Sequence, residues 1–182
     1  IGINKSDILM KMMAGDPLAI FGGLVMTNFE VDEALCRTLS GKMLDGIIAP
    51  AFTEGAIALL RRKGDKCRFV VNPALNGLVG KLDRTPRFRF VRGGFLMQPN
   101  YTFVPDFGRG EIVKHGKATP AQERDMVLAW AIGSTSNSNT ITLVKNEQLI
   151  GNGVGQQDRV GAANLAITRA RRSGHDLSGA AA

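Results

Sequence analysis

Residues 19–71, AIFGGLVMTNFEVDEALCRTLSGKMLDGIIAPAFTEGAIALLRRKGDKCRFVV, decide the fold. Short apolar runs alternate in this stretch with segments of helical periodicity. The apolar runs lie at 19–26, 46–49 and 67–71, and the helical segments at 31–39 and 53–62. Apolar runs of this length, bounded by Gly or Pro, are typical of buried strands. The order strand–helix–strand–helix–strand predicts an α/β fold with parallel neighbouring strands and right-handed crossovers.

The rest of the chain adds further elements of both kinds. Thr119-Pro120 predicts a helix start, with Thr119 as N-cap and Pro120 in the first helical position. That helix is expected to run to about residue 132. Thr53 and Ser6 are the expected N-caps of two earlier helices. The remaining expected elements are a helix at 6–13, a strand at 87–98 bent at Gly93-Gly94, strands at 141–144 and 148–150, and a helix at 160–172.

The glycine-rich stretch 151–159, GNGVGQQDR, stands between an expected strand and an expected helix. A turn there would aim backbone N–H groups and the positive end of the helix dipole at one point. Arg159 adds a permanent charge and a planar fork of donors. The stretch therefore predicts a site for a carboxylate, phosphate or polarised carbonyl. The alternative is a plain turn, since G-x-G-x-G is not the dinucleotide fingerprint.

Composition narrows the class of protein. The chain has 182 residues, of which 44% are hydrophobic, enough for a packed core. No run of 18 apolar residues occurs, so we expect no membrane contact and a cytoplasmic location. The two ends look cut from a longer chain. Cys36 and Cys67 are expected to be buried and reduced, and neither they nor His115 and His175 have metal-site spacing.

The net charge of +7 is concentrated in three clusters. They are Arg61, Arg62, Lys63, Lys66 and Arg68; Lys81, Arg84, Arg87, Arg89 and Arg92; and Arg169, Arg171 and Arg172. Such clusters attract nucleic acid or small anions, or pair with carboxylates. Few aromatic residues lie between the charges, so base stacking is weakly supported and nucleic acid is an unlikely partner. A basic nucleic-acid-binding domain remains one alternative.

Four blocks resemble the AICAR transformylase part of the bifunctional family AICAR transformylase/IMP cyclohydrolase. Residues 16–23, DPLAIFGG, resemble the family's Asp-Pro-x-Ser-x-Phe-Gly-Gly, and residues 45–52, DGIIAPAF, follow as the second block. Residues 138–140, SNT, stand in place of Ser-Asn-Ser/Ala. Residues 151–159 resemble Gly-x-Gly-x-Gly-Gln-x-x-Arg. The four blocks occur in family order over nearly the whole chain.

The resemblance implies transfer of a formyl group from 10-formyltetrahydrofolate to the 5-amino group of the nucleotide AICAR, in purine (IMP) biosynthesis. It implies cytidine-deaminase-like layered α/β lobes, each a mixed sheet with flanking helices, and a homodimer with the active site at its interface. Residues 1–117 would form most of the first lobe. Residues 118–182 would form a connecting helix and the start of the second lobe.

The resemblance also implies roles for individual residues. Asn139 would bind and polarise the formyl group, as an amide donor to a developing oxyanion, and Asp45 would lie near the transfer site. Ligand-binding positions would be Phe21 and Gly22 at the nucleotide base, Arg159 and Val160 beside the folate, and Gln156 in support of the turn. Hydroxyl positions around a monovalent cation such as K⁺ would be Ser136, Ser138 and Thr140.

Departures from the family pattern leave a second alternative open. The family's catalytic Lys-His, in a Lys-His-x-x-Pro-x-Gly segment, has no match here, and Lys114-His115 lies in an unrelated connection. Ala19 stands where Ser is common, and Ser134 where Lys is common. A non-catalytic nucleotide- or folate-binding module of the same fold is therefore the second alternative, and the chain by itself is expected to be inactive.

Overall fold

The computed structural model describes residues 4–76 and 82–182; Lys81 of the second basic cluster lies outside them. Helices and strands alternate in both halves of the chain. In order they are α1 (Lys5–Gly15), β1 (Gly23–Met26), α2 (Glu33–Leu39), β2 (Leu44–Ala49), α3 (Glu54–Leu60), β3 (Arg68–Val71), the 3₁₀ turn η1 (Pro73–Leu75), β4 (Arg87–Val91), β5 (Gly94–Gln98), α4 (Pro120–Thr135), β6 (Ile141–Lys145), β7 (Gln148–Gly153) and α5 (Arg159–Arg172).

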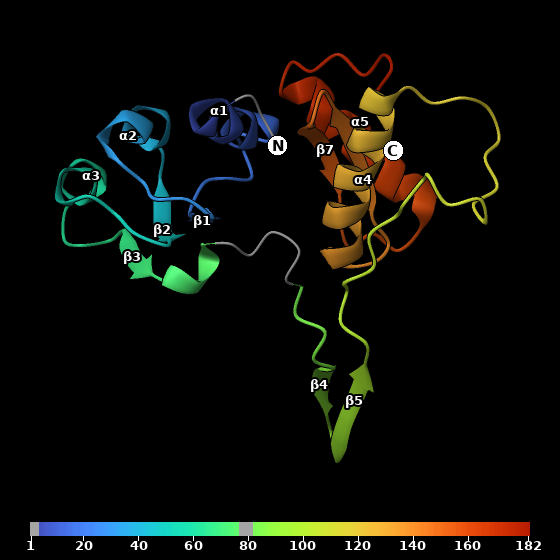
Figure 1. Cartoon of the computed structure of the whole chain (residues 1–182), viewed down its shortest axis with the longest axis horizontal. Coiled ribbons are helices and arrows are strands. Elements are labelled where there is room, and N and C mark those ends of the chain that lie inside the picture. Colours follow the sequence, from blue (N-terminus) through green and yellow to red (C-terminus); the bar gives the residue numbers. More distant parts are fainter. Residues whose placement is uncertain (1–3, 77–81) are drawn as a thin grey trace.

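The predicted α/β pattern of the first half is confirmed. Strands β1, β2 and β3 form a parallel sheet in that order. Helices α1, α2 and α3 lie along one side of this sheet (Figure 1), and their apolar residues form the core with Val25 and Ile47. The opposite side is uncovered, because Leu24 and Met26 of β1 are 68% and 63% exposed. The buried strand expected at 19–26, with a break at Gly22-Gly23, is thus limited to the residues of β1 and is buried on one face only.

The second half packs a two-stranded antiparallel hairpin, β6–β7, between helices. Residues 142–144 are all buried, and successive strand residues point to opposite faces, so both faces of the hairpin are covered. Helix α4 packs on β6, and α5 packs on β7 (Figure 1). The mixed α/β class is therefore established, with a parallel sheet and flanking helices.

Helix ends follow local chemistry. Thr53 and Thr119 cap α3 and α4 as predicted, through bonds from Ala56 N and Gln122 N to their hydroxyls. The Ser6 prediction is wrong: the side chain of Asn4 accepts from Asp7 N at 2.9 Å and caps α1 two residues earlier. Ser and Asn cap about equally well, so the position where the chain turns into the helix decided between them.

Two glycines of the expected turn are strand residues, which corrects the turn prediction. Gly151 and Gly153 belong to β7, where α5 approaches the backbone closely. A Cβ on Gly153 would lie 1.9 Å from the carbonyl oxygen of Ala162, and one on Gly151 would lie 2.4 Å from that of Ala166. These glycines therefore allow helix–strand contact. Gly155, with φ +68°, is the residue that turns the chain.

Helix α1 joins the two halves. A Cβ on Gly15 would lie 2.4 Å from the carbonyl oxygen of Leu149 in β7, so α1 ends directly against the hairpin. The Asp16 carboxylate pairs with Arg169 of α5, and the Nε2 atom of His175 lies 2.8 Å from the Gly15 carbonyl oxygen. The division at residues 117/118 stays a prediction, since α1 contacts elements on both sides of it.

The two cysteines are buried and unpaired, as expected. Burial raises the pKa of the Cys36 thiol, and the nearby Glu33 and Asp32 raise it further. Burial also raises the pKa of Cys67. A thiol with a raised pKa stays protonated at neutral pH, and the thiolate is the reactive form. Both cysteines therefore act as small core residues.

The strand expected at 87–98 is a hairpin, β4–β5, bent at Gly93-Gly94 as predicted. Every residue of its two strands is exposed. The hairpin projects away from both halves of the molecule (Figure 1). Among the described residues, no helix is long and apolar enough to cross a membrane.

Candidate functional site

Gly22 and Asp45 come together where strands β1 and β2 begin, and Phe21 directly precedes Gly22 in the chain. The backbone N–H of Gly22 donates to the carbonyl of Met43 at 2.6 Å, which fixes the 16–23 block beside the start of β2. A Cβ on Gly22 would lie 3.5 Å from the Asp45 carboxylate, and Gly22 has φ +70°. A side chain there would be strained by the left-handed backbone, and its Cβ would contact this carboxylate at an ordinary van der Waals distance.

The Asp45 carboxylate is held but open to solvent. It accepts from Nη1 of Arg62 at 3.0 Å, and the same nitrogen donates to the carbonyl of Leu44 at 2.9 Å. The Asp45 side chain is 61% exposed. Phe21, which precedes Gly22 in the chain, is 74% exposed. An exposed aromatic ring and a fixed, accessible carboxylate are both groups that can contact a flat, polar ligand.

Asn139 is the centre of a second polar group. Its backbone exchanges hydrogen bonds with Gln156, at 3.0 and 3.1 Å, and the Ser138–Asn139 peptide is cis. Its side-chain nitrogen donates to the carbonyls of Gln156 and Gln157, each at 3.2 Å. Carbonyls only accept, so the NH₂ side of the amide must face them. Both amide hydrogens of Asn139 thus hold the 156–157 backbone.

Arg159 and Val160 open helix α5 immediately after this loop. Asp158 caps the helix by accepting from Gly161 N at 2.7 Å. Val160 is 70% exposed, and Arg159 has no ion-pair partner in the part of the chain that the structure describes. The Gln156 side chain donates to the carbonyl of Val154 at 3.0 Å, so it braces the turn.

The three hydroxyl residues predicted for a cation lie beside Asn139. The Ser136 hydroxyl donates to the carbonyl of Ile132 at 2.8 Å, and the Thr140 hydroxyl to that of Asn137 at 2.7 Å. The Ser136 oxygen also accepts from Nδ2 of Asn152 at 3.4 Å, and the Ser136 and Thr140 oxygens each keep a lone pair for a hard cation. The donor chemistry therefore fits a monovalent cation. Among the described residues, no cluster of His, Cys, Asp or Glu could hold a metal.

The predicted site residues thus form two groups, one around Asp45 and one around Asn139. Within the described chain, no hydrogen bond or ion pair connects the first group to the second. Lys114 forms a surface ion pair with Glu123 at 2.8 Å, as lysines in loops commonly do. Lys114 of the Lys-His pair is therefore engaged outside both groups.

One apolar cavity of about 600 Å³ was not anticipated from the sequence. It lies between the 99–116 connection and α4, where Trp130 donates to the carbonyl of Phe103 at 2.9 Å. Phe107 and Ile112 line it on one side and Thr140 on another. The available signal was a Trp on α4 together with the Phe and Pro residues of the connection. The connection has no hydrophobic periodicity, so the sequence does not indicate that it lines a cavity.

The α/β fold and its two polar groups define a class, an α/β protein with open sites built on strand ends and glycine turns. Comparison with known proteins gives the family. The model of the AICARFT/IMPCHase bienzyme family matches residues 2–169, and the chain belongs to this family. It is 35% identical over 170 residues to the bifunctional purine biosynthesis protein PurH of Anoxybacillus flavithermus. The PurH proteins of Listeria welshimeri and Bacillus cereus are 34% and 31% identical. Each match covers 93% of this chain and 32% of the relative, so the chain spans about a third of these relatives.

Proposed function

We propose that these residues form part of a formyltransferase that moves the formyl group of 10-formyltetrahydrofolate to the 5-amino group of AICAR. Membership of the bienzyme family supports this proposal, as does the purine biosynthesis role in the relatives' names. The observation that carries it is that folding brings Gly22, and with it the neighbouring Phe21, close to Asp45 of a separate block of the sequence.

In this proposal the two groups have different tasks. Phe21 and Gly22 receive the flat base of the nucleotide, and Asp45 accepts from its amine or carboxamide. Asn139 holds the 156–157 backbone, which positions Arg159 and Val160 toward the folate. An Asn139 N–H reaches a formyl oxygen only after leaving one of its two carbonyl partners. Asn139 is thus a positioning residue in this structure and an oxyanion donor after that exchange.

The chemistry demands orientation more than acid or base strength from these residues. The AICAR amine is a weak nucleophile, because its lone pair is delocalised into the imidazole and its carboxamide. Holding it against the formyl carbon removes much of the entropic barrier. A proton must still leave the amine, and the family's Lys-His for that task has no match here. Ser136, Ser138 and Thr140 would hold a monovalent cation, which supplies positive charge beside the Asn139 loop.

The 182-residue chain by itself is therefore expected to give no formyl transfer. The measurement is product formation from AICAR and 10-formyltetrahydrofolate, with the chain at high concentration and K⁺ present. A catalytically complete relative, assayed in parallel, is the positive control. Turnover by the 182-residue chain that disappears in Asp45→Asn would contradict the proposal that this chain lacks the groups needed for proton removal.

A non-catalytic nucleotide- or folate-binding module is the second candidate. The commitment of both Asn139 amide hydrogens to backbone carbonyls favours it, because no amide donor is then free for an oxyanion. Homodimer formation and a cytoplasmic location belong to the same proposal. Sedimentation analysis of the chain tests the dimer, with a concentration-independent monomer as the contrary result.

A further inference from the structure

A small polar groove lies where the β4–β5 hairpin meets the end of α4. Its volume is about 130 Å³, and it is separate from the apolar cavity beside Trp130. It is lined by Arg87, Phe88, Arg89 and Gln98 of the hairpin, by Tyr101, and by residues 135–137 at the end of α4. The set contains two arginines and no carboxylate. Neither the proposed base site nor the folate positions include these arginines.

Strand register places the two arginines on the same face of the hairpin. Arg87 pairs with Gln98 and Arg89 with Leu96, and residues two apart on a strand share a face. Phe88 and Phe90 take the opposite face by the same rule, and Phe88 also borders the groove. The sequence RFRF therefore sorts charge to one side of the hairpin and aromatic rings to the other.

The two guanidinium groups are not neutralised within the described chain. Some arginines elsewhere are ion-paired, as Arg62 is with Asp45 and Arg124 with Glu147. Arg87 and Arg89 have no ion pair in residues 4–76 and 82–182. The Arg87 guanidinium lies over the Tyr101 ring, 5.3 Å from its centroid. Stacking on a ring restrains the guanidinium without supplying an acceptor for its N–H groups.

Hydrogen-bond donors surround this charge. Gln98 donates to the Tyr101 hydroxyl oxygen at 2.8 Å, so the tyrosine hydrogen is left to donate. The C-terminal end of α4 lies beside the groove, and there the Thr135 and Ser136 hydroxyls donate to the carbonyls of Ala131 and Ile132. The helix end still carries partial negative charge, which the two guanidinium groups must outweigh to hold an anion.

We propose that this groove binds an oxyanion, either a phosphate or a carboxylate, through the forks of Arg87 and Arg89 and the hydroxyl of Tyr101. Arginine presents paired donors that match the oxygens of both groups. The inference does not depend on formyl transfer. If that function holds, the anion belongs to the charged end of a ligand, since residues 135–137 lead directly to Asn139.

The test is a titration of the isotope-labelled chain, followed by NMR signals of the arginine Nε–H groups and of the amides at 135–137. Inorganic phosphate and a short γ-linked glutamate peptide are the two probes, at constant ionic strength. Saturable shifts at these positions with either probe support the groove. The tighter probe identifies phosphate or carboxylate as the ligand group.

Paired variants separate a built site from general positive charge. Arg87→Gln with Arg89→Gln should weaken binding about tenfold or more, since two charge-assisted interactions are lost. Arg92→Gln lies at the hairpin turn outside the groove and should change the affinity less than about twofold. Arg89→Lys should give an intermediate loss, because it keeps the charge without the fork. Equal losses in the Arg92 and Arg89 variants, or no shifts at 135–137, would overturn the proposal.

Discussion

Gly153→Ala should lower the free energy of unfolding by about 3 kcal/mol or more, near or above the upper end of ordinary overpacking. The added methyl would lie 1.9 Å from the carbonyl oxygen of Ala162 and 2.9 Å from the Ala166 nitrogen. Both atoms are helix backbone, so α5 itself must move. Ala162 and Ala166 are fully buried against β7, and that contact would be lost. Urea unfolding of the two proteins measures the change.

Gly155→Ala is the matched control. Gly155 has φ +68° and open space around its Cβ position, so a side chain there meets only the strain of the left-handed region, about 1 kcal/mol. If the two substitutions lower the free energy of unfolding by the same amount, both glycines are needed for their backbone conformation. The close approach of α5 to β7 would then not be the reason for Gly153.

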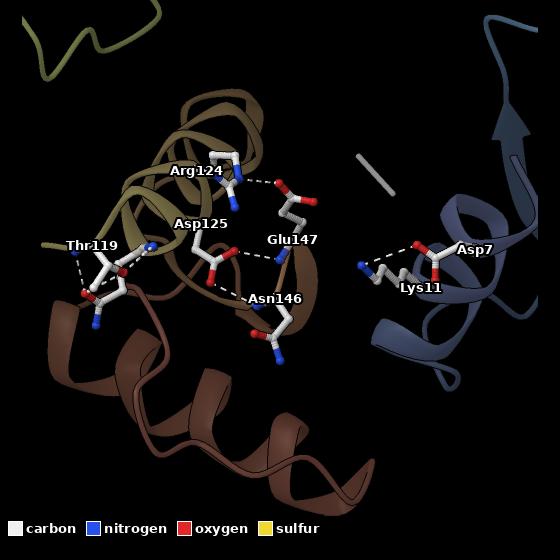
Figure 2. A network of polar contacts seen from close by, with 8 residues as sticks. Asp7, Lys11, Thr119, Arg124, Asp125, Asn146 and Glu147 are labelled. Carbon is white, nitrogen blue, oxygen red and sulfur yellow. Dashed lines mark hydrogen bonds and ion pairs between the residues drawn. The ribbon is translucent and has the colours of Figure 1, made fainter. Parts of the chain in front are cut away.

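Asp125→Ala should also cost about 3 kcal/mol, through a different mechanism. Asp125 of α4 is 5% exposed. Its carboxylate accepts from the backbone N–H of Asn146 at 2.9 Å and of Glu147 at 2.6 Å (Figure 2). These two residues form the β6–β7 turn with φ of 54° and 59°. Hydrogen bonds to a buried charge are among the strong ones, and removing the carboxylate leaves two donors without an acceptor.

We call the two hydrogen bonds from the turn backbone to Asp125 the Asp125 clamp. The substitution Glu147→Gly distinguishes this clamp from the ion pair next to it. The substitution removes the bond from Arg124 to Glu147, 2.7 Å long (Figure 2), which is worth about 0–1 kcal/mol at a surface. It also relieves a left-handed conformation that glycine adopts freely. The net change should be below about 1 kcal/mol in either direction. A loss in Asp125→Ala no larger than this would refute the clamp.

Local signals in the sequence predicted much of the fold correctly. Thr53 and Thr119 were identified as caps because a cap bonds within its own first turn, and the parallel strands because apolar runs alternated with helices. Signals that depend on a distant neighbour were misread. Gly151 and Gly153 suggested a turn, since glycine serves turns and close packing equally well, and only the position of α5 distinguishes these uses.

The candidate site shows the same limit. The resemblance selected Phe21, Gly22 and Asp45, and the structure brings them together through the bond between Gly22 and Met43. The resemblance did not indicate that the Asn139 side-chain amide donates to the 156–157 backbone. That detail depends on where two carbonyls, 17 and 18 residues away, are directed.

The most direct test of the proposed function is a formyl-transfer assay on a polypeptide of the relatives' full length that carries these 182 residues. Asn139→Ala should lower kcat/KM by about 100-fold or more, whether it removes an oxyanion donor or displaces the Arg159 loop. The control is Asn164→Ala, an exposed amide on α5, which should retain full activity. The predicted result is formyl transfer by the unsubstituted full-length polypeptide, with activity lost in Asn139→Ala and kept in Asn164→Ala. Undiminished transfer in Asn139→Ala would contradict the account, as would an unsubstituted polypeptide that binds AICAR without forming product.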